Sequence, residues 1–257
     1  MASAESFQMQ HRSKGLPVAA MLLSNSELLW SKIRLAEARL HSASNRFWSH
    51  PDLAEMLPAF LVQLHRVMKG GIELMRVARV RSLALSGDPV AAIVAPYLDQ
   101  HILEEKDHDA WLLDDIETLG ITPLEVSRAT PLASVVSLLG AQYFWALNIH
   151  PVAVFGYLIV LEGNPPVAAQ LETIRRRTGL PATAFRCLME HADNDPHHIA
   201  DLNRTLDAMP LTDEQEKYLA LSAFHTIDAV ASVFDELLEL HAASPKSTLD
   251  AFTPAYG

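Results

Sequence analysis

The sequence predicts an all-α protein built as a single helical bundle. Apolar residues recur with the helical period along most of the 257 residues, whereas the alternation typical of strands is scarce. Most glycines and prolines fall between the long periodic segments. Hydrophobic residues make up 49% of the chain, which is enough for one large core, so a second domain is not required.

Start and stop signals place the helices in the first half of the chain. A Ser-Asn cap opens a first helix that we expect to end near His41. The segment 51–84 forms one or two helices, with a break or kink expected at its Gly-Gly pair, residues 70–71. The segment 88–120 is expected as one long helix that ends at its last glycine, and the connector 121–131 holds a short helical turn.

The second half of the chain contains the most apolar helices. Segments 131–148 and 151–163 are expected as a buried pair that is split or kinked at Pro151. A shorter helix covers 164–179, with prolines near its start and a glycine at its end. The last two helices are expected at 181–209 and 211–243. The predicted organisation is a polar N-terminal segment, a helical domain and a C-terminal tail, at residues 1–24, 25–243 and 244–257.

Charge and composition narrow the classes of function. The formal net charge is −11, so the field of the protein repels phosphate backbones and anionic lipids. We therefore expect neither nucleic acid nor a membrane as a partner. The single cysteine, Cys187, forms no internal disulfide, and the sequence shows no signal pattern. These observations predict a cytoplasmic protein, and long apolar helices with an acidic surface are compatible with a homodimer.

The segment HADNDPHH, residues 191–198, places three histidines and two aspartates in eight residues. On a helix, His191, Asp195 and His198 fall within an arc of about 60°, because spacings of four and three share a face. Two imidazoles and one carboxylate suit a borderline divalent metal such as iron, manganese or zinc. Pro196 lacks a backbone donor, so we expect this segment to be kinked or marginally helical without metal and to be ordered by metal binding.

A second cluster, HILEEKDHD, covers residues 101–109. On a continuous helix, one face about 100° wide carries His101, Glu104, Glu105 and His108. Glu105 and His108 form the i, i+3 carboxylate–imidazole pair that carboxylate-bridged di-iron proteins use from a helix. The neighbouring residues are apolar, and burying carboxylates among them would be costly without a cation.

The third feature is Glu162, which ends a long apolar run before Gly163 stops the helix. A carboxylate in the last turn opposes the helix dipole by about 0.3–1 kcal/mol, and this position is easier to understand if a cation faces it. Each of the three features alone has an ordinary explanation as a solvated helix face or a chance pair. Together they supply three imidazoles and three carboxylates, which is the ligand set for two metal ions with open positions.

This ordered set resembles that of the haem-oxygenase-like di-iron oxidases and oxygenases, over about residues 88–243. That family has a Glu and a His on one core helix, a single Glu on a later helix, and then His-x3-Asp-x2-His. The matching positions here are Glu105, His108, Glu162, His191, Asp195 and His198. The Glu-x2-His spacing and the Glu-Gly step at 162–163 are most similar to the branch of 1-alkene-forming fatty-acid decarboxylases. Other branches space the first Glu and the His further apart, which leaves His101 or Glu104 as substitute ligands or as neighbours of the ligands.

The resemblance implies a single-domain haem-oxygenase-like bundle that holds two Fe(II) ions per chain. The ligand set also accommodates a manganese–iron pair. It further implies that O₂ is a co-substrate and that the substrate is a small or medium-sized organic acid, amino acid or amine. Reactions in the family include oxidative decarboxylation, N-oxygenation and C–C cleavage, and the ligand motif does not distinguish among them.

Four further residues are candidates for contacts with the ligand imidazoles or with the substrate: Asp115, Asp201, His225 and Asp228. Solvated acids and an ordinary core pair are the alternative explanations. The competing function is that of a cofactor-independent enzyme of the same fold, similar to thiaminase II or to the pyrroloquinoline quinone synthase. Such an enzyme does not need six convergent ligands, and Cys187 lacks the context expected of a thiaminase nucleophile.

Overall fold

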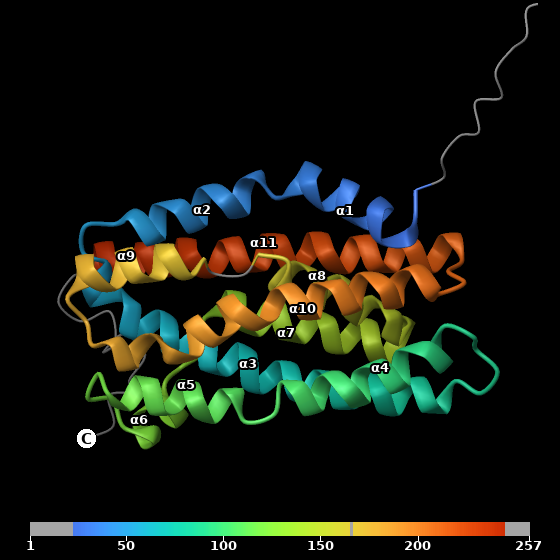
Figure 1. Cartoon of the computed structure of the whole chain (residues 1–257), viewed down its shortest axis with the longest axis horizontal. Coiled ribbons are helices and arrows are strands. Elements are labelled where there is room, and N and C mark those ends of the chain that lie inside the picture. The colour runs from blue at the N-terminus through green and yellow to red at the C-terminus, as the bar shows by residue number, and fades with distance from the viewer. Residues whose placement is uncertain (1–22, 165–166, 245–257) are drawn as a thin grey trace, which may run out of the picture.

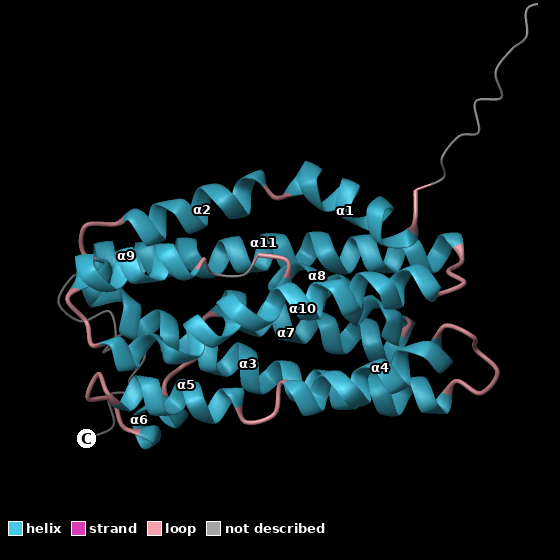
Figure 2. Ribbon diagram, in the orientation of Figure 1, coloured by secondary structure: helices cyan, strands magenta, loops and turns pink. Residues whose placement is uncertain are grey.

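The computed structural model describes residues 23–164 and 167–244, without the side chains of residues 194–196. Within this part every regular element is a helix and no strand occurs (Figure 2), so the all-α prediction is confirmed. The α-helices are α1 (Asn25–Ala36), α2 (Ala38–Ser49), α3 (Leu53–Ala84), α4 (Ala91–Glu104), α5 (His108–Glu117), α6 (Pro123–Arg128), α7 (Ala133–Phe144), α8 (Val154–Glu162), α9 (Ala168–Thr178), α10 (Arg186–Ala208) and α11 (Asp213–Ala243). The expected terminal segments lie almost wholly outside the described residues.

Helices α3 and α11 form the centre of the bundle (Figure 1). Helix α11 packs against α1, α2, α7 and α8, and α3 packs against α4, α5 and α7. The side chains between them form one continuous apolar core. At the end where α2 meets α3, Phe60 and Phe234 stack, and the ring of Phe47 packs against both at a tilt. Among the described helices, none has the length and apolar character needed to cross a membrane.

Two of the expected helix boundaries are wrong. The first helical region does not end near His41: α1 gives way to α2 at Glu37, and α2 continues to Ser49. The Gly-Gly pair at 70–71 does not break α3, which runs for 32 residues. A Cβ atom on Gly71 would lie 3.0 Å from the hydroxyl oxygen of Tyr157. This glycine therefore permits close packing and does not end the helix.

The expected long helix over 88–120 is divided in two. Helix α4 ends at Glu104 and α5 begins at His108. Between them Asp107 has φ of 70°, which lies in the left-handed region that side chains other than glycine rarely adopt. The break therefore falls inside the acidic and histidine-rich cluster, where it changes the direction of the side chains.

The apolar helix pair is interrupted where the sequence predicts. Helix α7 continues into a π-helical turn, Trp145–Ile149, and a 3₁₀ turn starts at Pro151 before α8. Helix α8 then crosses α11 at Gly156. A Cβ atom at this position would lie 2.3 Å from the carbonyl oxygen of Leu219, so only glycine lets the two backbones approach. This crossing fixes the helix whose last residue is Glu162.

Candidate metal centre

The break between α4 and α5 positions the first pair of expected ligands. Glu105 follows the last residue of α4, and His108 is the first residue of α5. Oε2 of Glu105 lies 3.0 Å from Nδ1 of His108. The neighbouring Glu104 accepts a hydrogen bond of 2.8 Å from the side-chain amide of Gln100, and its other oxygen lies 3.5 Å from Nδ1 of His101.

Helix α10 brings two more imidazoles, those of His191 and His198, to the same region. Nδ1 of His191 donates a hydrogen bond of 2.8 Å to the carbonyl oxygen of Cys187, one turn earlier on the helix. Since the carbonyl only accepts, Nδ1 carries a proton, and Nε2 is the nitrogen whose lone pair binds a metal ion once its own proton is displaced. Nε2 lies 3.8 Å from Oε2 of Glu105. This is the arrangement in which a backbone group orients a metal-binding imidazole.

A buried carboxylate anchors the start of α10. Asp115 accepts hydrogen bonds of 2.8 Å from the backbone N–H of Cys187 and of 2.8 Å from Nε of Arg186. Its side chain is 1% exposed. Sequence reasoning expected Asp115 to contact a ligand imidazole. Instead it supports that ligand indirectly, by holding the turn of α10 to which the His191 imidazole is bonded.

The candidate ligands form two groups, within each of which the ligand atoms lie within 4.8 Å of one another. The first group consists of Glu105, His108 and His191, and the second of His101, Glu162 and His198. Glu105 connects them, because its Oε1 lies 3.3 Å from Nδ1 of His198 while its Oε2 faces the first group. One carboxylate between two three-residue groups is the arrangement of a bridged two-metal site.

Two buried atoms in the second group have no hydrogen-bond partner in the described part of the chain. They are Oε2 of Glu162 and Nδ1 of His198, which lie 3.9 Å apart. Buried polar atoms of this kind are costly unless something satisfies them. A cation between the two atoms would bind both, so the donor set fits a metal ion at this place.

The charges of the site point to the same conclusion. Burial disfavours a charged imidazole, but the hydrogen bond and the charge of Glu162 outweigh it and raise the pKa of His101 from 6.5 to about 9. Burial likewise opposes protonation of His191, but its contacts with Cys187 and Glu105 raise its pKa to about 11. Burial also opposes ionisation of Glu105, yet hydrogen bonds with His108 and His191 hold its pKa well below the usual range. The carboxylates thus draw positive charge into the positions where metal ions would bind.

His101, which the sequence offers only as a substitute ligand or a neighbour of the ligands, lies in the second group itself. Its side chain is 2% exposed, and its Nε2 lies 2.8 Å from Oε1 of Glu162. Tyr97, one turn earlier on α4, stacks on the His101 ring at a centroid distance of 5.4 Å. The Tyr97 hydroxyl is buried without a hydrogen-bond partner among the described residues. Sequence reasoning missed Tyr97, although its i, i+4 spacing from His101 on the same helix was a usable signal.

Other expected residues lie elsewhere or are not described. The side chain of Asp195 is outside the described residues, so its role as a ligand stays a prediction. Asp201 forms an ion pair of 2.9 Å with Arg204 on the surface. Two other candidates face α7 and α2: His225 donates to the carbonyl oxygen of Ser137 at 3.1 Å, and Asp228 pairs with Arg39. Within the described residues, these contacts of Asp201, His225 and Asp228 are therefore not with the candidate ligands.

A cavity of about 200 Å³ opens beside the two groups of ligands. Four candidate ligands contribute to its wall: His101, Glu105, Glu162 and His191. The rest is mostly apolar and comes from α3, α8 and α10, including Leu64, Met68, Met75, Tyr157, Leu161 and Leu188. A second cavity of about 810 Å³ shares Leu64, Leu161 and Leu188 with the first. These three leucines line both cavities. They therefore lie between the cavity beside the candidate ligands and the second cavity, which is larger and more polar.

Solved structures with a similar fold come from three bacteria. A domain of unknown function with a heme oxygenase-like fold from Shewanella denitrificans OS217 is 17% identical, with a TM-score of 0.66 over 87% of this chain and 94% of that one. A TenA homolog from Pseudomonas syringae pv. tomato DC3000 is 12% identical, with a TM-score of 0.65 over 91% and 100%. A CADD-like protein of unknown function from Nostoc punctiforme PCC 73102 is 18% identical, with a TM-score of 0.59 over 82% and 98%.

These similarities show a haem-oxygenase-like helical bundle, as the sequence predicts. No curated protein matches the sequence. The model of one family, described as iron-containing redox enzymes, matches residues 77–231. This match spans more than half of the chain and includes both groups of candidate ligands. The chain therefore belongs to the family of iron-containing redox enzymes.

Proposed function

We propose that the protein is a non-haem di-iron enzyme that uses O₂ to oxidise a small or medium-sized organic molecule. The observation that carries this proposal is the position of Glu105, whose carboxylate faces both groups of candidate ligands beside an apolar cavity. The family supports iron as the metal. The number of ions is inferred from the two groups.

The proposed ligands divide between two metal positions. His108 and His191 would hold one ion, and His101, Glu162 and His198 would hold the other, with Glu105 shared. Asp195, on the same helix as two of these histidines, is proposed as a further ligand from its spacing alone. When bound, two ferrous ions supply the electrons that reduce O₂ and the open positions where it meets the substrate.

The protein's own contribution is to orient the ligands and to exclude water. The carbonyl oxygen of Cys187 fixes the direction of His191, and Asp115 fixes the turn that carries this carbonyl. The apolar side chains of the cavity keep bulk water from the reacting atoms, which strengthens every electrostatic interaction there. Tyr157 closes one wall, with its hydroxyl directed at the position where Gly71 leaves room.

The chemistry of the cavity favours an aliphatic acid or amine over a zwitterionic amino acid. Its described lining includes no lysine or arginine, and its walls are mainly leucine, methionine and valine. A substrate carboxylate would therefore find its positive partner at the metals, while the rest of the substrate lies against apolar side chains. The resemblance of the ligand spacing to the 1-alkene-forming fatty-acid decarboxylases supports an aliphatic acid in particular.

The thiaminase II-like form of the competing cofactor-independent function would require Cys187 as a nucleophile. Its thiol is buried and lies 3.7 Å from Nδ1 of His191. However, that nitrogen already donates its proton to a carbonyl, so it has no lone pair with which to accept the proton of the thiol. This contact counts against an activated cysteine. We propose a small organic molecule as the partner, with no nucleic acid or membrane; a homodimer stays a prediction.

Oxygen consumption by iron-loaded protein tests the proposal. Straight-chain fatty acids, aliphatic amines and amino acids are offered in parallel, and we expect aliphatic acids to accelerate uptake of O₂ the most. The variant Glu105→Gln should abolish this acceleration, whereas Cys187→Ser should retain it. No acceleration with any of these compounds, or acceleration that survives in Glu105→Gln, would reject the di-iron function.

A further inference from the structure

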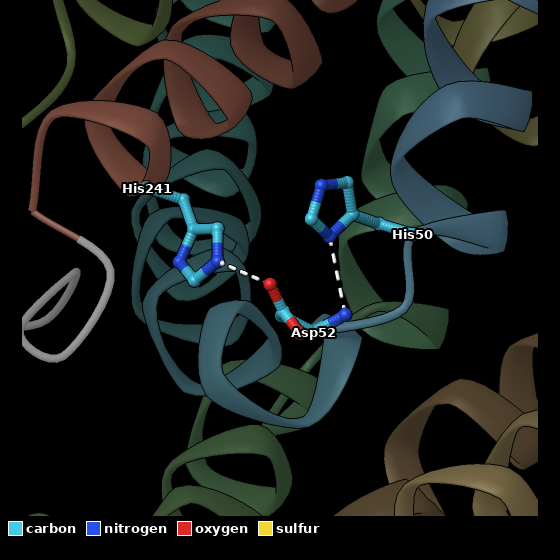
Figure 3. Close-up of side chains that lie close together, drawn as sticks. All are labelled: His50, Asp52 and His241. Carbon is cyan, nitrogen blue, oxygen red and sulfur yellow. Dashed lines mark hydrogen bonds and ion pairs between the residues drawn. The ribbon is translucent and has the colours of Figure 1, made fainter.

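A second cluster of metal-binding side chains lies at the end of the bundle where α2, α3 and α11 meet (Figure 3). His50 directly follows α2, Asp52 directly precedes α3, and His241 lies in the last turn of α11. None of the three belongs to the candidate di-iron centre. The imidazole and carboxylate donor atoms of these residues all lie within 4.8 Å of one another.

The contact between two of these residues already has the spacing of a metal site. Nε2 of His241 lies 3.2 Å from Oδ2 of Asp52. Two ligands bound to a tetrahedral zinc ion at about 2.0–2.2 Å from the metal are about 3.3 Å apart. The His50 and His241 rings are nearly perpendicular, at 85°, with their centroids 5.4 Å apart. Figure 3 shows the His241 ring facing the carboxylate of Asp52, while the His50 ring lies on the other side with its Nδ1 turned to the backbone nitrogen of Asp52.

The local backbone explains why the carboxylate is available. An aspartate that precedes a helix usually caps it by accepting a hydrogen bond from the first turn. Asp52 makes no such bond to α3. Separately, the backbone N–H of Asp52 donates a hydrogen bond of 3.2 Å to Nδ1 of His50. The Asp52 carboxylate contacts His241 and does not take the usual capping role of an aspartate at this position.

Exposure differs among the three residues in a way that suits a site open to solvent. His241 is buried, His50 is half-buried, and the Asp52 side chain is 52% exposed. The buried imidazole provides a fixed ligand, and the half-buried ring of His50 has room to exchange its backbone hydrogen bond for a metal. The open side of Asp52 leaves space for an ion to enter and for a water molecule to complete its coordination.

We propose that His50, Asp52 and His241 form a second metal site, which binds one Zn²⁺ ion or a similar borderline divalent cation. Two imidazoles, one carboxylate and one water molecule are a common set for such an ion. The ion would tie together the ends of three helices. This inference does not rest on the proposed di-iron function, because the two sites share no residue.

Equilibrium dialysis of the full-length, metal-free protein against micromolar free Zn²⁺, followed by elemental analysis, tests the proposal. The wild-type protein is compared with Asp52→Asn, His50→Gln and the control His41→Gln, which changes an exposed histidine on the same helix α2. We expect the wild type and His41→Gln to bind one ion more per chain than the other two variants. This difference does not depend on how many ions the di-iron centre takes up. In protein that carries Glu105→Gln, the further change Asp52→Asn should therefore remove the same one ion.

Equal zinc content in the wild type, Asp52→Asn, His50→Gln and His41→Gln would overturn the proposal. The contact between Asp52 and His241 would then be an ion pair between helix ends and nothing more. Far-UV circular dichroism establishes that each variant is folded. Should Asp52→Asn fail to fold, the pair His50→Gln and His41→Gln decides alone, because the loss of the half-buried His50 ring leaves the Asp52–His241 contact in place.

Discussion

Oε1 of Glu105 lies 3.3 Å from Nδ1 of His198, on the side of the carboxylate that faces away from His108. This relationship depends on the break between α4 and α5, because Glu105 stands at the end of one helix and not within it. The same carboxylate therefore contacts imidazoles from α5 and α10. In the proposed centre both contacts would be replaced by bonds to metal ions.

Replacement of Glu105 should affect both metal positions at once. We expect Glu105→Gln to weaken Fe(II) binding by at least about 100-fold, because changes even to groups outside the ligand shell commonly cost 10–100-fold. Glu117→Gln, which changes an exposed carboxylate at the end of α5, is the matched control and should leave the stoichiometry unchanged. Anaerobic titration monitored by elemental analysis provides the measurement. Equal losses in the two variants would argue against a bridging role for Glu105.

Metal affinity should rise with pH above neutrality. The pKa values of His101 and His191 are raised to about 9 and about 11, so in metal-free protein at pH 7 both side chains are in the charged, doubly protonated form. Binding displaces these protons, so affinity should increase by about tenfold per pH unit for each proton displaced, with the share of His101 ending near pH 9. Proton release in weakly buffered solution measures the effect, and His101→Gln should reduce it by about one proton per chain. A release that is unchanged in His101→Gln would contradict the assignment.

The sequence predicts the type of most elements and most of the side chains that meet in the candidate site, but it does not predict the break at residues 105–107. Helical periodicity continues through this segment, and only the left-handed backbone of Asp107 interrupts it. For the same reason the sequence could not decide between His101, Glu104 and Glu105, because all three share a face of an uninterrupted helix. Gly71 illustrates a second limit of the sequence. Its packing against Tyr157 is a contact between distant segments, which the sequence does not show, so the glycine pair alone predicts a break or kink.

The crossing of α8 and α11 should be sensitive to a single methyl group. A Cβ atom on Gly156 would meet the backbone of Leu219 at 2.3 Å, and backbone atoms move less readily than side chains. We expect Gly156→Ala to lower the free energy of unfolding by about 1–3 kcal/mol, the usual cost of overpacking. Gly140→Ala is the control, because a Cβ atom there meets nothing within 4 Å and should stabilise helix α7 by about 0.5–1 kcal/mol. Urea denaturation distinguishes the two, and equal midpoints would contradict the proposed crossing.

Metal binding should protect the segment that carries His191 and His198. Its backbone is helical throughout, while Pro196 lacks one hydrogen-bond donor, so the marginal stability expected of this helix without metal stays a prediction. Ligands on both sides of it would tie the segment to α5 and α8. We expect hydrogen exchange over residues 191–201 to slow when Fe(II) is added anaerobically, while the core of α11 remains unchanged. Equal protection with and without metal would show that the segment is already ordered.

The most direct test of the central claim is an anaerobic Fe(II) titration of metal-free protein, followed by a pulse of O₂ under stopped-flow absorbance. The proposed centre predicts uptake of two ions per chain and a transient visible absorption band after the pulse. In Glu105→Gln both features should be lost. Uptake of one ion or none, with no absorbance change that depends on O₂, would contradict an oxygen-activating pair of irons between α4, α5, α8 and α10.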